Sequence, residues 1–200
     1  ATGPSDPAGQ WVFNEGMSSP TALAVADETV YVANEDGRLY AFDAETGGEQ
    51  WRFRTGGPVM EPTVVDGTVF ISTADGAVRA VDGGDGSQQW QFEPEGELYT
   101  QPAVGDGVVY VGVRVRGLNG DVVYALDASD GRERWRFEER QRVYEALTVA
   151  DGSVYVHFGD HLLALNTEDG SERWRFETGE VSGVTVTDGA VVGVGDEVIQ

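Results

Sequence analysis

A tryptophan-led triplet recurs along the chain at nearly constant spacing. Tryptophan stands at positions 11, 51, 90, 135 and 174, which gives intervals of 40, 39, 45 and 39 residues. Each tryptophan opens a similar triplet, as in Trp51-Arg52-Phe53 and Trp135-Arg136-Phe137. A period near 40 residues is typical of propellers and other repeat proteins, in which each repeat is one supersecondary unit. This period constrains the fold more than any other feature of the sequence.

Within each repeat, short β-type runs alternate with turn residues. Asp-Gly pairs, the strongest short hairpin signal, stand at 66–67, 106–107, 151–152 and 188–189. Strand-like runs such as Val30-Tyr31-Val32 and Leu39-Tyr40-Ala41 flank these and other turns. No stretch has the sustained 3.6-residue apolar period of a helix. We therefore predict an all-β propeller of four-stranded antiparallel blades, with strands A to D running outward from the central axis and the tryptophan in strand D.

The two ends of the sequence complement each other. Residues 182–186, 190–194 and 197–200 read as strands A, B and C of a last repeat that has no strand D. Trp11-Val12-Phe13 reads as a strand D that has no A, B or C before it. We predict five blades in one domain, residues 11–200, closed by Trp11-Phe13 completing the last blade, with residues 1–10 as a lead or linker. Closure would remove exposed strand edges. The alternative is a piece of a longer propeller.

The charge is strongly one-sided. The chain has 35 acidic residues and 13 basic ones, for a net charge of −22, and all 13 basic residues are arginine. Such a charge repels itself unless it is screened, and the Debye length falls to about 3 Å at 1 M salt. An acidic surface without lysine resembles the proteins of halophilic archaea; an ordinary acidic protein usually keeps some lysine. Nucleic acid is an unsuitable partner, because binding phosphates needs a basic face.

Two further features bear on the cellular location of the protein. There is no cysteine, and so no disulfide or thiolate site. No apolar run approaches the roughly 20 residues of a transmembrane helix. The polar start, residues 1–7, is typical of a mature chain or of an engineered boundary rather than of a signal peptide, and leaves the question of export open. We expect an exported protein, extracellular or at the cell surface.

The repeat resembles that of the PQQ-like (quinoprotein-type) β-propeller family. The segment from Val30 to Trp51 carries the resemblance, as do 69–90, 108–135 and 153–174. The resemblance implies a propeller and two possible roles. The family's enzymes are eight-bladed dehydrogenases that hold pyrroloquinoline quinone (PQQ), often with Ca²⁺, in the central funnel and use an Asp base; some add a Cys pair. Its non-enzymes include the propeller subunit of the bacterial outer-membrane barrel-assembly machine.

This sequence departs from the pattern of the enzymes. It lacks cysteine, shows about five repeats and has no long insertions. No family catalytic residue can be carried over to it, and we predict no catalytic residue and no cofactor.

Two arginine-bearing loops stand out in so acidic a chain. The predicted B–C loop at 114–121 and the predicted D–A loop at 138–145 belong to the same repeat and should be neighbours. Arginine suits carboxylate, phosphate and interface contacts. We predict a partner-binding patch whose members are Arg114, Arg116, Arg140, Arg142 and Tyr144. The alternative is local neutralisation of Glu138 and Glu139, since surface ion pairs are common.

A second candidate set precedes each predicted strand A and should circle the mouth of the central channel. Its members are Ser19, Glu61, Gln101, Glu145 and Ser182. Two glutamates could hold a hydrated cation but are too few to predict a metal site. His157 and His161 flank a predicted B–C turn without a third ligand in view, so they also predict no metal.

Together these features favour a non-catalytic scaffold. We expect a protein-interaction or structural module that acts through its loop faces, either with a protein partner or by self-association. The alternative is a PQQ-dependent dehydrogenase or a fragment of one. A carbohydrate-binding lectin is a weaker alternative, because its sites would need similar aromatic residues in all the loops.

Overall fold

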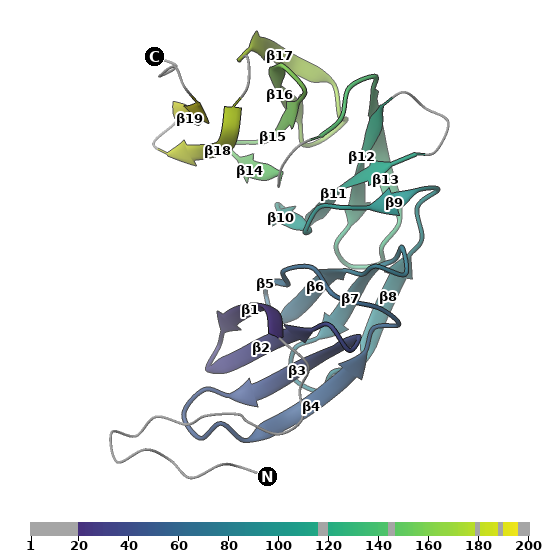
Figure 1. Ribbon diagram of the computed structural model, residues 1–200, viewed down its shortest axis with the longest axis vertical. Coiled ribbons are helices and arrows are strands. Elements are labelled where there is room, and N and C mark those ends of the chain that lie inside the picture. The colour runs from purple at the N-terminus through teal and green to yellow at the C-terminus, as the bar shows by residue number, and fades with distance from the viewer. Residues whose placement is uncertain (1–19, 116–119, 144–146, 179–180, 188–189, 196–200) are drawn as a thin grey trace. The chain divides into compact units, whose positions relative to one another are not determined.

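The computed structural model shows a chain built from β-strands (Figure 1). It describes residues 20–115, 120–143, 147–178, 181–187 and 190–195. For the last two ranges only the backbone is described. The chain divides into two compact units, residues 1–91 (unit 1) and 92–200 (unit 2). The described residues contain no helix long and apolar enough to cross a lipid bilayer.

Unit 1 holds two four-stranded antiparallel sheets, each with its strands in chain order. The first sheet comprises β1 (Pro20–Ala26), β2 (Thr29–Asn34), β3 (Arg38–Asp43) and β4 (Glu49–Arg54). The second comprises β5 (Thr63–Val65), β6 (Thr68–Ser72), β7 (Val78–Asp82) and β8 (Gln88–Phe92).

Unit 2 holds two further sheets of the same order and a strand pair. The third sheet comprises β10 (Ala103–Gly105), β11 (Val108–Arg114), β12 (Asp121–Asp127) and β13 (Glu133–Glu139), with β9 (Glu97–Leu98) also paired to β11. The fourth comprises β14 (Thr148–Ala150), β15 (Ser153–Phe158), β16 (His161–Asn166) and β17 (Glu172–Glu177). The pair is β18 (Val181–Thr187) with β19 (Ala190–Gly195).

The predicted repeat is confirmed in its main part. Each of the four sheets follows the predicted A-to-D order, and the predicted A and B strands of the last repeat are β18 and β19. The predicted C strand at 197–200 and the closing strand Trp11-Phe13 lie outside the described residues. The sequence did not predict β9, which pairs Leu98 with Val113.

The Asp-Gly pairs at 66–67, 106–107 and 151–152 form two-residue hairpin turns between strands A and B. Both residues of such a turn have positive φ, as in Asp66 (48°) and Gly67 (72°). Turns of this kind match the twist of the flanking strands, and glycine adopts the second position without steric cost. In the first sheet this second position is occupied by Glu28, with φ of 62°.

We expect Glu28→Gly to raise the free energy of unfolding by about 0.5–1 kcal/mol, because it removes a left-handed non-glycine residue from a turn. The Glu28 side chain is exposed, so no buried contact is lost. Urea unfolding in multimolar KCl measures the change. Glu45→Gly is the matched control, since it removes the same charge from an exposed turn position whose φ is not positive. An equal gain in the control would assign the effect to charge instead.

The repeated tryptophan joins each sheet to the next within a unit. The Trp51 Nε1–H donates to the carbonyl oxygen of Gly83 at 2.9 Å, and a Cβ on Gly86 would lie 2.7 Å from the indole ring. In unit 2 the Trp135 Nε1–H donates to Thr167 O at 3.0 Å, and Gly170 lies under that ring in the same way. The prediction that the tryptophan packs between blades is confirmed for these two pairs.

Trp174 departs from this pattern. Trp51, Trp90 and Trp135 are 7–8% exposed, whereas Trp174 is 38% exposed. Its ring nevertheless lies 5.9 Å from Tyr155 at 48°, the same arrangement as Trp51 with Tyr31. Trp174 therefore keeps the conformation of the repeat without the cover that its counterparts have.

Candidate functional site

A buried carboxylate organises the arginine-bearing loops of unit 2. Asp121, the first residue of β12, is 1% exposed. Its Oδ2 accepts hydrogen bonds from the Tyr99 hydroxyl at 2.8 Å and from the Val143 N–H at 2.9 Å. Tyr99 follows β9 and Val143 follows β13, so one side chain ties two loops to the end of a strand. Buried charges persist in proteins when they are paired and hydrogen-bonded in this way.

Arg114 completes this cluster. It ends β11 directly opposite Asp121, and its Nε lies 3.5 Å from Asp121 Oδ1. Its guanidinium also stacks over the Tyr99 ring, 4.8 Å from the centroid, as a cation–π contact. Burial raises the pKa of Tyr99, and the hydrogen bond to Asp121 raises it further, so the hydroxyl stays protonated and remains a donor.

The two predicted arginine-bearing loops are neighbours in the structure. The Asp121 N–H donates to Gln141 O at 3.2 Å, and a Cβ on Gly120 would lie 1.9 Å from Glu139 O. Glycine at position 120 is therefore required by the close approach of the loops. Of the predicted patch, Arg116 and Tyr144 lie outside the described residues.

Arg140 and Arg142 are both exposed. Within the described part of the chain, neither guanidinium forms an ion pair. Among the described residues, the nearby carboxylates have other ion-pair partners, since Glu138 pairs with Arg136 at 3.6 Å and Glu139 pairs with Arg175 at 2.8 Å. Two arginines without an ion pair to any described residue are an exception in a chain of net charge −22.

The loop that carries these arginines is held by the adjacent sheet. The Gly159 N–H donates to Arg142 O at 3.0 Å, and the Asp160 N–H donates to Gln141 Oε1 at 3.3 Å. A β-bridge joins Val143 to Phe158. The backbone of residues 141–143 is thus fixed while the arginine side chains stay in solvent.

The two histidines belong to structural contacts. Buried His161 accepts from Arg175 Nη1 at 2.9 Å through Nε2, which leaves Nδ1–H to donate to Asp160 Oδ1 at 3.0 Å. Burial acts to raise the pKa of Glu139, but hydrogen bonds from Arg175 and the Arg140 N–H outweigh it and lower this pKa. His157 Nε2 lies 3.4 Å from Thr178 Oγ1.

The predicted channel-mouth set is only partly placed. Glu61 is exposed in unit 1 and Gln101 is half-buried in unit 2. Ser19 and Glu145 lie outside the described residues, and Ser182 is placed only as part of β18. A common ring for these residues stays a prediction.

Comparison with known proteins gives the family. The family model described as outer membrane protein assembly factor BamB, of the PQQ-like repeat type, matches residues 4–100 and 78–200. The chain belongs to this family. No protein of curated function matches the sequence.

Solved structures of the PQQ-like propeller type share the fold at low identity. Quinohemoprotein alcohol dehydrogenase ADHIIG from Pseudomonas putida HK5 is 16% identical with a TM-score of 0.69, over 88% of this chain and 38% of that one. The computationally designed Ika4 protein is 21% identical with a TM-score of 0.64, over 82% and 95%. BamB from Moraxella catarrhalis is 16% identical with a TM-score of 0.57, over 92% and 76%.

Two pockets within the described residues do not fit a quinone or cation of the kind that the PQQ-dependent dehydrogenases hold. The described residues contain no group of three or more His, Asp or Glu side chains that could hold a metal ion. Pockets of about 240 Å³ and 430 Å³, one in each unit, have charged, glycine and small polar or aliphatic linings, without an aromatic ring on which a quinone could stack. We therefore assign no reaction through a quinone or a bound cation to these pockets.

Proposed function

We propose that this PQQ-like propeller chain is a non-catalytic interaction scaffold that contacts a protein partner, or further copies of itself, through its loop faces. One observation carries the proposal: Arg140 and Arg142 are exposed, unpaired within the described residues and held on a fixed loop. Arginine is enriched at protein interfaces because its planar fork forms several directed hydrogen bonds.

The architecture supports a scaffold role for this loop. The backbone that presents the arginines is ordered before any contact, so little conformational entropy would be lost on binding. The family's description as an assembly factor accords with a protein that acts by binding other proteins. The net charge of −22 disfavours nucleic acid as the partner.

The proposal includes the finer features predicted from sequence. We propose a ring of five blades, closed by Trp11-Phe13 completing the blade of β18 and β19, in an extracellular or cell-surface protein of a halophilic archaeon. Supporting features are the β18–β19 pair, which reads as strands A and B of a further blade, and the exposed Trp174 of the preceding sheet. The acidic, lysine-free composition suits a protein that functions at high salt, where its self-repulsion is screened.

We expect the double substitution Arg140→Ser and Arg142→Ser to weaken self-association or partner binding at least tenfold, because it removes the free arginine forks. Arg114 is left in place, since it pairs with buried Asp121. Sedimentation equilibrium and light scattering in multimolar KCl measure self-association. Affinity capture from extract, at equal bait concentration, compares partner recovery.

The double substitution Arg132→Ser and Arg136→Ser is the matched control. It removes the same charge from exposed arginines of the same sheet that pair with Asp130 and Glu138. Equal association in both double variants would rule out the Arg140–Arg142 loop as the contact surface.

A further inference from the structure

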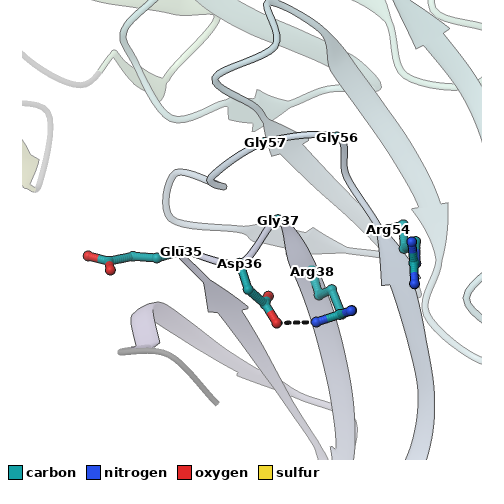
Figure 2. A pocket seen from close by; sticks show the side chains of 7 residues that line it. All are labelled: Glu35, Asp36, Gly37, Arg38, Arg54, Gly56 and Gly57. Carbon is teal, nitrogen blue, oxygen red and sulfur yellow. Dashed lines mark hydrogen bonds and ion pairs between the residues drawn. The ribbon is translucent and has the colours of Figure 1, made fainter. Parts of the chain in front are cut away.

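Unit 1 contains a small pocket where two loops of the first sheet meet (Figure 2). Its volume is about 240 Å³, and it lies between the β2–β3 turn and the loop after β4. The Thr55 N–H donates to Gly37 O at 2.9 Å, and a Cβ on Gly37 would lie 3.2 Å from Gly57 N. The pocket is lined by Glu35, Asp36, Gly37, Arg38, Arg54, Gly56 and Gly57.

Two arginines stand opposite each other at this pocket. Arg38 on β3 and Arg54 on β4 are directly paired in the antiparallel register. Like charges in this relation destabilise a sheet unless an anion lies between or beside them. Arg38 has Asp36 as an ion-pair partner, drawn as the dashed line in Figure 2.

Arg54 has no such partner. It is exposed, and among the residues that the structure describes it forms no ion pair. Figure 2 shows the Glu35 side chain pointing away from both arginines. The lining thus holds two arginines and two carboxylates, of which Arg54 and Glu35 form no ion pair with another described residue.

Glycine backbone forms the other wall. Gly37 and Gly56 have φ of 75° and 81°, and a Cβ on Gly56 would lie 2.5 Å from Asp75 Oδ2. The N–H groups of Gly56 and Gly57 donate no hydrogen bond to another described residue. Backbone N–H groups in glycine turns, together with an arginine fork, are a recurring means of holding an anion such as a peptide carboxylate.

We propose that this pocket binds a single carboxylate group, held by Arg54 and Arg38 and by the N–H groups of Gly56 and Gly57. The volume suits a carboxylate and its nearest atoms and lies below the usual range for drug-sized ligands. At high salt the general attraction between charges is screened, so the paired hydrogen bonds of the guanidinium would supply the specificity. The carboxylate could come from a free small acid or from the chain terminus of a partner peptide.

The test is a titration of the ¹⁵N-labelled chain in 2 M KCl, followed through amide chemical shifts. The probes are acetate, an N-acetylated alanine pentapeptide with a free carboxylate, and the same peptide amidated. We expect saturable shifts at Gly56 and Gly57 with both carboxylate probes and none with the amidated peptide. Acetate binding as tightly as the free peptide assigns the site to small acids; tighter peptide binding assigns it to chain termini.

Arg54→Gln should weaken the binding at least fivefold. Arg52→Gln is the matched control, because Arg52 lies two residues away on the same strand, is exposed and pairs with Glu49 at 2.9 Å. Shifts that do not saturate, that appear equally with the amidated peptide, or that respond alike to both substitutions would overturn the proposal. None of these readouts depends on Arg140 or Arg142, so the site and the proposed interaction loop can fail separately.

Discussion

Asp121→Ala should lower the free energy of unfolding by about 3–5 kcal/mol, because two donors lose hydrogen bonds to a buried charged acceptor, each worth about 1.5–3 kcal/mol. The substitution leaves the Tyr99 hydroxyl and the Val143 N–H without their common acceptor and the Arg114 guanidinium without its ion-pair partner. Each of these donors is held near the buried carboxylate, so water cannot replace it freely. Chemical unfolding in multimolar KCl, followed by tryptophan fluorescence, measures the loss.

Two further variants distinguish the effect of the buried Asp121 charge from the effects of side-chain volume and of removing an acidic residue. Asp121→Asn keeps an oxygen acceptor and the side-chain volume, and should cost about 1–3 kcal/mol, as expected when a hydrogen bond to a charged group is weakened. Asp130→Ala removes a 44%-exposed carboxylate that pairs with Arg132, and should cost less than about 1 kcal/mol. A loss of the same size in all three variants would mean that Asp121 is not the centre of the loop structure.

The Asp121→Asn substitution also tests whether the buried carboxylate supports the proposed function. Asp121 fixes the loop after β13 through Val143, and that loop carries Arg140 and Arg142. If the arginines act from a fixed backbone, Asp121→Asn should weaken association although both arginines remain. The buried carboxylate would then be a positioning residue for the interaction surface.

The fold could be predicted from sequence because its determinants are local and repeated. The tryptophan period sets the sheets, and the Asp-Gly pairs set the A–B turns, with positive φ at both residues, as in Asp106 and Gly107. A feature that recurs from repeat to repeat supports the same prediction at several places in one sequence. The positions of strands β18 and β19 were predicted for the same reason.

The sites were harder to predict because they depend on departures from the repeat. Sequence reasoning found the loops of Arg114 and Arg140 but missed Asp121, since an acidic residue beside a loop reads as surface. The hairpin register, which places Arg114 opposite Asp121, was the signal that could have found it. Arg54 was missed because its unpaired state depends on the direction of Glu35, which no pattern in the sequence fixes (Figure 2).

The second large effect is expected at the repeated tryptophan. Trp135→Ala should lower the free energy of unfolding by about 3–5 kcal/mol, the range for a large aromatic removed from a core. The indole is 8% exposed, packs on Gly170 and donates its Nε1–H to Thr167 O. Its loss leaves a cavity between two sheets and removes the shorter of the two hydrogen bonds to Thr167 O, which also accepts from the Tyr110 hydroxyl at 3.5 Å.

Trp174→Ala is the matched comparison, because Trp174 occupies the same repeat position with 38% exposure. Because the proposed ring covers this face with its last blade, we expect a loss close to that of Trp135→Ala, whereas a face left 38% exposed would lose about 1 kcal/mol or below. Denaturant unfolding of both variants in the same multimolar KCl gives the difference directly. Equal losses would mean that the Trp174 face is covered in solution, as the proposed closing strand Trp11-Phe13 or a second copy would require; a wide difference would mean that this face stays open, which the proposed ring does not allow.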